Sequence, residues 1–232
     1  MASTASRALV ELMAEAYRLQ LLRGLEELLL RHHGHRLVAG VDEAGRGCLA
    51  GPVVAAAVVV DARSLVLGVN DSKKLTAEER GRLAPAIRGL CVASSVCSQS
   101  ASVIDRINIL EATRRAMVGA LLELPMQPDC ALVDAVALGD LPFPCLALNR
   151  GDAFSFAVAC ASILAKTERD ALMEGYDRTY PGYGFASHKG YAVDEHRRAL
   201  EELGPTPIHR LTFRSVIPRD ESRERSTTGV VA

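Results

Sequence analysis

The sequence predicts an α/β protein in which a mixed β-sheet is covered by helices. Residues 37–41 and 53–60 are apolar runs that are too short for typical helices, and they flank a glycine-rich turn, as two buried strands would. From residue 76 onward, further short apolar runs alternate with longer segments that have helical spacing. A strand pair followed by alternating strands and helices is the order expected of a mixed sheet.

The N-terminal region carries leucines at helical spacing, so we expect one amphipathic helix over residues 8–31 that ends near Gly34. Its apolar stripe is expected to pack on the body of the protein, and binding of a partner is the alternative. The histidines at positions 32, 33 and 35 could ligate a metal. A helix C-terminus, which favours cations, explains them more simply.

Later elements follow from capping and periodicity. Thr76 with Glu79 three residues on predicts a capping box, and a helix that runs from there to about Arg88. The remaining expected elements are a strand at 90–98, a helix at 107–124, strands at 131–134 and 145–148, and helices at 154–174 and 193–203.

Composition narrows the class of protein. The 232 residues suit one domain with appendages, and a net charge of −1 gives no global sign of nucleic-acid binding. Six cysteines show no C-x-x-C pair, which favours buried thiols in a reducing cytosol over disulfides or a metal site. Glu11 and Glu15 interrupt any signal-peptide core, and no apolar run reaches the ~18 residues that span a bilayer. We therefore expect a cytoplasmic protein.

Acidic residues occur at three expected element ends: Asp42 with Glu43, Asp134 and Asp152. Two carboxylates 4 Å apart repel by about 4 kcal/mol at an effective dielectric of 20, so a converging group needs protons or cations. Oxygen ligands without histidine or thiolate favour Mg²⁺ or Mn²⁺, and such ions suit attack of water on a phosphodiester. Taken singly, each acid is more often a cap or a solvated loop residue.

Basic side chains near these loops could contact a phosphodiester: Arg46, Lys73, Lys74, Lys166 and Lys189. Lys73 and Lys74 precede a helix start, where positive charge is mildly unfavourable, and this favours a functional role slightly. Lys166 could instead pair with Asp170 on one helix face. Three aromatic residues, Tyr183, Phe185 and Tyr191, could stack on sugars or bases, although a local core patch explains them about as well.

A competing motif is Gly45-x-Gly47-x-x-Ala50, which matches the dinucleotide-binding fingerprint. That fingerprint must open a helix, whereas Pro52 and the valine-alanine run after it favour a strand. A dinucleotide-dependent oxidoreductase is therefore a weak alternative, to be judged by the element that follows Gly51.

Several blocks match one known family in order. They are Asp42-Glu43-Ala44-Gly45-Arg46-Gly47, Gly51-Pro52, Asn70-Asp71-Ser72-Lys73-Lys74-Leu75, Ile107-Asn108-Ile109-Leu110, Val133-Asp134, Gly151-Asp152, Ala161-Ser162-Ile163-Leu164-Ala165-Lys166 with Arg169-Asp170, and Tyr183-Gly184-Phe185-Ala186-Ser187-His188-Lys189-Gly190-Tyr191. Over about residues 36–215 the sequence resembles bacterial ribonuclease HII.

The resemblance implies a ribonuclease-H-like fold with a mixed five-stranded sheet and a helical C-terminal part. The matched stretch leaves a helical extension (1–35) before a catalytic domain (36–217), and the polar, charged composition of residues 218–232 predicts a disordered tail. The resemblance also implies cleavage of RNA–DNA hybrids and of duplex DNA with embedded ribonucleotides, and we expect the protein to be a monomer. The cut would lie on the 5′ side of the ribonucleotide and leave 3′-hydroxyl and 5′-phosphate ends. A non-catalytic hybrid-binding protein is the other alternative.

The resemblance also assigns residues. Asp42, Glu43, Asp134 and Asp152 align with catalytic carboxylates that bind Mn²⁺ or Mg²⁺. Gly45, Arg46 and Gly47 align with the loop that reads the ribose 2′-hydroxyl, and Tyr191 with a tyrosine beside the RNA–DNA junction. Lys73, Lys74, Ser162 and Lys166 align with phosphate contacts. Several sites depart from the family pattern: Cys48 replaces proline, Ala135-Val136 replaces glycine-asparagine, Arg150 replaces lysine, and Phe154 and Phe156 are bulkier than expected at the helix entry.

Overall fold

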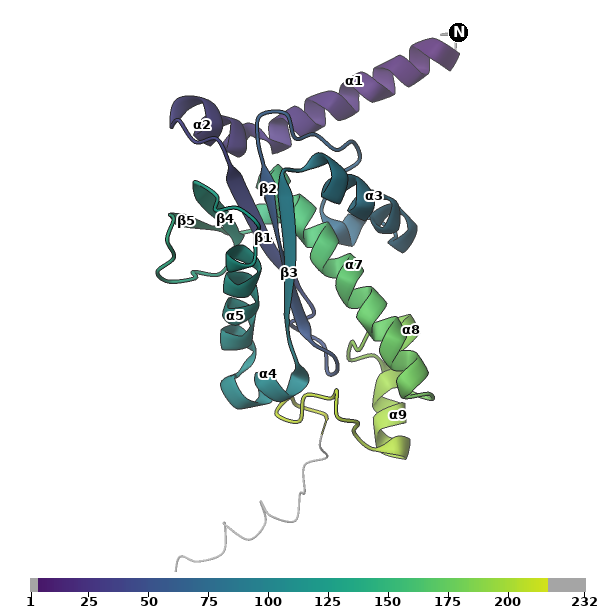
Figure 1. Ribbon diagram of the computed structural model, residues 1–232. Helices are drawn as coiled ribbons and strands as arrows, with labels where there is room; N and C mark the ends of the chain where they lie inside the picture. The colour runs from purple at the N-terminus through teal and green to yellow at the C-terminus, as the bar shows by residue number, and fades with distance from the viewer. Residues whose placement is uncertain (1–3, 217–232) are drawn as a thin grey trace, which may run out of the picture.

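The computed structural model describes residues 4–216, and it contains the mixed five-stranded sheet that the sequence predicts (Figure 1). The strand order is β3-β2-β1-β4-β5. The β1–β2 and β2–β3 pairs are antiparallel, whereas β1–β4 and β4–β5 are parallel. The strands are β1 (Val38–Ala44), β2 (Val53–Val60), β3 (Ala93–Gln99), β4 (Cys130–Asp134) and β5 (Cys145–Leu148).

Helices cover both faces of this sheet (Figure 1). The helices are α1 (Thr4–Leu22), α2 (Gly24–His32), α3 (Ala77–Leu90), α4 (Ala101–Ile107), α5 (Ile109–Leu122), α6 (Gly151–Phe154), α7 (Phe156–Thr179), α8 (Phe185–His188) and α9 (Asp194–Leu203), with a 3₁₀ turn, η1 (Ser72–Lys74). Helix α7 packs on one face and α5 on the other, so all eight residues of β2 are buried. A strand buried on both faces reads as a continuous apolar run, as residues 53–60 do.

Close packing of α7 on β1 positions the strand end that carries the first two acids. A Cβ on Gly40 would overlap the backbone of Ala157, so only glycine allows this approach of helix and strand. Asp42 lies two residues further along β1 and therefore points to the same face of the sheet as Gly40. The sequence thus places an acid directly beneath α7.

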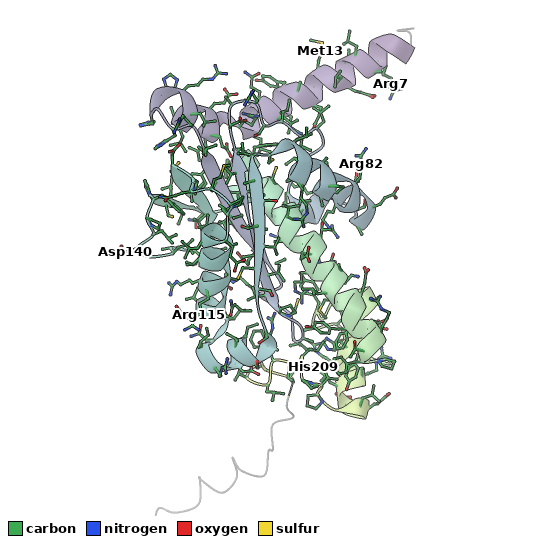
Figure 2. All side chains as sticks on the ribbon, viewed as in Figure 1. Arg7, Met13, Arg82, Arg115, Asp140 and His209 are labelled. Carbon is green, nitrogen blue, oxygen red and sulfur yellow. The ribbon has the colours of Figure 1, made fainter. Side chains whose placement is uncertain are left out.

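The N-terminal helix differs from the prediction. It breaks at Arg23 into α1 and α2, and the side chains of Leu9, Met13 and Tyr17 are 57%, 63% and 65% exposed. The expected packing of this stripe is wrong for most of α1, because the helix extends away from the body (Figures 1 and 2). Its C-terminal half does contact the body: Glu15 accepts from Gly68 N, and Leu19 is fully buried. No helix of residues 4–216 is long and apolar enough to span a membrane.

Two other predicted helices are also divided. Asn108, with φ of 66°, separates α4 from α5, and Ser155 separates α6 from α7. The capping box of Thr76 and Glu79 is confirmed at the start of α3. Leu110 of α5 is 41% exposed, and the buried face of this helix carries Ala116, Met117 and Leu121. The predicted tail at 218–232 lies outside the described residues.

Candidate active site

Three acids meet at the ends of two neighbouring strands. One carboxylate oxygen each from Asp42, Glu43 and Asp134 lies within 4.8 Å of the other two. The parallel register pairs Val41 of β1 with Val133 of β4, so the next residue on each strand is an acid. The predicted convergence of these three residues is confirmed.

Burial and mutual repulsion disfavour the charged forms. Burial, followed by the charges of Glu43 and Asp134, raises the pKa of Asp42 well above its usual range. Burial also raises the pKa of Glu43, although Arg46, whose Nη1 lies 3.5 Å from Glu43 Oε1, opposes the rise. The cluster therefore has excess negative charge that one arginine offsets only in part.

The donor set fits a divalent cation. Oε2 of Glu43 is buried and has no hydrogen-bond partner among the described residues. A buried polar atom without a partner is costly, and a bound cation would satisfy it. All the clustered ligand atoms are carboxylate oxygens, which Mg²⁺ and Mn²⁺ prefer. Within residues 4–216 no other group of metal-ligating side chains meets this geometry, and His32, His33 and His35 are outside it.

Asp152 lies beside this cluster and is not one of the three grouped acids. The backbone N–H of Gly151 donates to Asp134 Oδ1 at 2.6 Å, which anchors the turn that carries Asp152. Burial raises the pKa of Asp152, with further increases from Asp71 and Asp134, while Lys73 opposes them. Asp152 also lines a neighbouring cleft of about 470 Å³.

The three-acid cluster opens into a cleft of about 340 Å³ that contains most of the predicted site. Its lining includes Asp42, Glu43, Gly45, Arg46, Ser72, Lys73, Arg80, Asp134, Ser162, Lys166 and Tyr191. Two predicted substrate-binding residues are not in the lining: Gly47 is exposed nearby in the sequence, and Lys74 lines the neighbouring cleft with Asp152.

Hydrogen bonds fix the basic rim of the cleft. Lys166 Nζ donates to Asp170 at 2.7 Å, as the pairing alternative predicted, and it also lies 5.5 Å from the ring centroid of Tyr191. Arg80 donates to the same Asp170 at 3.2 Å. Sequence reasoning missed Arg80, since it looks like any charged residue on a solvated helix.

A hydrogen bond that links η1 to α7 was also not predicted from the sequence. The hydroxyl groups of Ser72 and Ser162 share a hydrogen bond of 2.8 Å, which ties η1 to α7. Lys73, the next residue of η1, lines the cleft together with both serines. By contrast Lys189 pairs with Glu174 at 2.6 Å and does not line the cleft.

The aromatic segment divides between core and site. Tyr183 and Phe185 are buried, with their rings stacked at 5.2 Å, so the core-patch alternative is right for them. Tyr191 is 44% exposed and lines the cleft. The element after Gly51 is strand β2, which excludes the dinucleotide-binding alternative because that motif must open a helix.

Two departures from the family pattern have unusual backbones. Ala135 and Arg150 adopt φ of 53° and 60°, in the left-handed region that favours glycine. They lie directly after Asp134 and directly before the Gly151-Asp152 turn. Asp134 and Asp152 therefore each lie within two residues of a backbone position in this strained conformation.

The sheet order and the acids at the ends of β1 and β4 define the ribonuclease-H-like class of nucleases. The family model described as ribonuclease HII matches residues 39–216. Ribonuclease HII of Geobacter metallireducens is 50% identical over 190 residues, 82% of this chain and 89% of that protein. Ribonuclease HII of Enterococcus faecalis is 52% identical over 180 residues, 78% of this chain and 70% of that protein.

Solved structures of related ribonucleases have the same fold. The ribonuclease H2 of Pyrococcus horikoshii superposes with a TM-score of 0.68 at 29% identity, covering 78% of this chain and 95% of that one. The chain belongs to the ribonuclease HII family. The family match begins at residue 39, so α1 and α2 lie outside it.

Proposed function

We propose that this chain is a metal-dependent endonuclease that cleaves the RNA strand of RNA–DNA hybrids and the 5′ side of single ribonucleotides in duplex DNA. The products are 3′-hydroxyl and 5′-phosphate ends. The observation that carries the proposal is the meeting of Asp42, Glu43 and Asp134 within 4.8 Å in a cleft rimmed by cationic side chains. Membership of the ribonuclease HII family supports it.

Asp42, Glu43 and Asp134 are the residues that would hold Mg²⁺ or Mn²⁺, with Asp152 beside them. Such a cation, when bound, offsets the charge of the scissile phosphate and lowers the pKa of the attacking water. Oxygen donors at one buried corner favour a hard cation over zinc.

Cationic side chains position the phosphate. Burial lowers the pKa of Lys73, but the negative charges of Asp152, Asp42, Asp71 and Asp134 together raise this pKa above its ordinary value, so Lys73 stays protonated. Lys73 and Lys166 line the cleft and can contact phosphate oxygens, and Ser162 adds a hydroxyl beside them. Lys74 would contact a phosphate further along the strand, in the neighbouring cleft.

Other residues of the cleft lining recognise the ribose. The loop of Gly45, Arg46 and Gly47 brings its backbone close to the 2′-hydroxyl, the group that distinguishes RNA from DNA. Gly45 adopts φ of +94°, a conformation that L side chains rarely adopt. Tyr191 presents an exposed ring on the same cleft, where it can pack against a sugar.

The test is cleavage of a DNA duplex that carries one ribonucleotide, with Mg²⁺ or Mn²⁺, followed by mapping of the cut. A single cut on the 5′ side of the ribonucleotide, with none in the matching all-DNA duplex, is the expected result. Folded protein that binds the duplex without metal-dependent cleavage would instead indicate a hybrid-binding protein.

We also propose that the enzyme works as a cytoplasmic monomer. All six cysteines are free thiols, which suits a reducing compartment. The three clustered acids and the lining of their cleft already supply the metal-ligand and phosphate-contact roles of the proposal. Sedimentation of the active protein would test the monomer.

A further inference from the structure

Two arginines outside the proposed catalytic set, Arg169 of α7 and Arg210 near the C-terminus, are fully buried. Neither forms an ion pair within residues 4–216. A buried charge without a counter-ion costs several kcal/mol unless hydrogen bonds compensate. The hydrogen bonds of these guanidinium groups therefore indicate what the two residues hold in place.

Arg210 binds backbone carbonyl groups of the glycine-rich loop, residues 45–52. Its Nη2 donates to Gly45 O at 2.7 Å and to Gly51 O at 2.9 Å. Its Nη1 donates to Arg46 O at 2.8 Å, and its Nε donates to Gly51 O at 3.0 Å. One planar group thus gathers carbonyls from both ends of the loop.

Arg169 joins the same loop to a second segment, residues 189–191. Its Nε donates to Pro52 O and its Nη2 to Ala50 O, each at 3.0 Å. Its Nη1 donates to Lys189 O at 2.9 Å. Residues 189–191 end on the tyrosine that lines the cleft. Arg169 therefore connects the two backbone segments that the proposed function assigns to ribose recognition.

The two segments also touch directly. Leu49 N donates to Gly190 O at 2.8 Å, and a Cβ on Gly190 would come within 2.5 Å of Ala50 O. A Cβ on Gly45 would overlap the Arg169 side chain. Little free space remains among these groups, so a shift of one segment must displace the arginine or the other segment.

We propose that Arg169 and Arg210 are positioning residues for ribose selectivity: they join the loop 45–52 and the segment 189–191 into one unit. This inference rests on the proposed function. Neither side chain lines the cleft, so both act through the backbone that they hold. The loop 45–52, which meets the 2′-hydroxyl, and the segment 189–191, which carries Tyr191, then stay at a fixed separation. This separation determines which sugar fits between them.

Lysine cannot replace either guanidinium group. Arginine offers five N–H donors in one plane, and these two side chains bind three carbonyl groups each. Lysine has one nitrogen on a flexible stem, and it cannot reach three fixed carbonyl groups in different directions. The variants Arg169→Lys and Arg210→Lys therefore keep the charge and remove the geometry.

The test measures KM and kcat on the duplex with one ribonucleotide, and Ki of the matching all-DNA duplex as a competitor. Each lysine variant should raise KM about tenfold or more, the effect of losing one or two charge-assisted hydrogen bonds. Ki of the DNA duplex should stay unchanged, so the ratio Ki/KM falls. A merely structural role would lower the melting temperature or the active fraction, and so kcat, without changing this ratio.

Arg178→Lys is the matched control, since Arg178 lies on the same helix α7 and is exposed. It should leave KM, kcat and Ki unchanged. A folded Arg169→Lys or Arg210→Lys variant with a wild-type Ki/KM ratio would overturn the proposal. If the wild-type enzyme itself shows no preference for the ribonucleotide duplex, the proposed function fails instead.

Hydrogen exchange of the wild-type chain tests whether the loop 45–52 and the segment 189–191 form one unit, and this test does not require the variants to fold. The amide of Leu49 is bonded to Gly190, that of Gly51 to Ile208, and that of Arg210 to Leu49. If these segments move as one unit, the three amides share one opening free energy. Clearly different opening free energies for them would contradict the proposal.

Discussion

The backbone N–H of Gly151 donates a hydrogen bond of 2.6 Å to Oδ1 of Asp134. This bond ties the last residue of β4 to the turn that carries Asp152. One carboxylate therefore has two roles: it contributes charge to the cluster at the end of β1, and it anchors the helix start that brings the fourth acid alongside. The two roles can be separated by experiment.

Asp134→Asn keeps an oxygen that can accept from Gly151 but removes the negative charge. We expect cleavage to fall on the order of 100-fold or more, because a metal-ligand charge is lost. Duplex binding and folding should persist. An assay with the single-ribonucleotide duplex measures cleavage, and fluorescence anisotropy measures duplex binding. The control is Asp140→Asn, exposed in the β4–β5 connection (Figure 2), and near-normal cleavage by Asp134→Asn would contradict the assignment.

Divalent cations should stabilise the fold, since they relieve the repulsion among Asp42, Glu43 and Asp134. A ligand at 100 times its Kd adds about 2.7 kcal/mol. For a chain of this size that corresponds to roughly 5–10 °C in Tm. Thermal unfolding with Mg²⁺ or Mn²⁺, compared with EDTA, measures the shift. Equal Tm values under both conditions would argue against a metal site here.

Local sequence patterns predict the sheet and the acid cluster well, for a physical reason. A strand such as 53–60, buried on both faces, leaves a continuous apolar run, and parallel neighbours bring their carboxyl ends to one edge. Asp42 and Asp134 therefore meet as soon as β1 pairs with β4. The capping box of Thr76 is equally local, because both of its hydrogen bonds lie within four residues.

Features that depend on tertiary contacts could not be predicted from the sequence. The break at Ser155 is only partly local: Ser155 Oγ caps α7 by accepting from Val158 N, but Ala157 N donates to Glu26 of α2, which is distant in the sequence. Arg80 joins the cleft through Asp170, on a helix far away in the sequence. The exposed stripe of α1 has the same periodicity as a packed helix, so periodicity alone predicts the wrong outcome.

A buried histidine pair provides a test of pH dependence. Thr206 N donates to His209 Nδ1 at 2.8 Å, so the proton of a neutral His209 is on Nε2. That atom lies 3.0 Å from His196 Nε2, and His196 Nδ1 lies 2.9 Å from Tyr191 O. This chain of bonds requires both rings to be neutral, because two protonated Nε2 atoms would face each other.

Burial, with a contribution from His196, lowers the pKa of His209 to about 4 from an ordinary 6.5. The unfolded chain therefore binds the proton more tightly than the folded chain does between these pH values. The stability contributed by the pair is complete above about pH 6.5 and is lost as the pH falls toward 4. Tm measured against pH should show this slope. His209→Gln should reduce the slope of Tm against pH, whereas His33→Gln, at an exposed histidine, should not. Equal slopes for these two variants would contradict the role of His209 in the pH dependence.

The final prediction concerns the side chain that joins the N-terminal region to the body. Glu26 of α2 is fully buried, and its Oε1 accepts hydrogen bonds from Ser155 Oγ at 2.5 Å and from Ala157 N at 2.8 Å. It therefore caps α7 one turn after Asp152. Glu26→Ala leaves buried donors without a partner, so we expect a loss of about 2–4 kcal/mol in unfolding free energy by urea denaturation.

The control for this variant is Glu11→Ala, because Glu11 is exposed on α1 and pairs only with its helix neighbour Arg7 among the described residues. It should leave stability unchanged. If Glu26→Ala is instead as stable as Glu11→Ala, the contact of α2 with the α6–α7 junction contributes little to stability, and residues 1–35 are an extension outside the catalytic domain. If it is destabilised as expected, α2 is part of the catalytic domain, and cleavage should weaken as well because the α6–α7 junction positions Asp152.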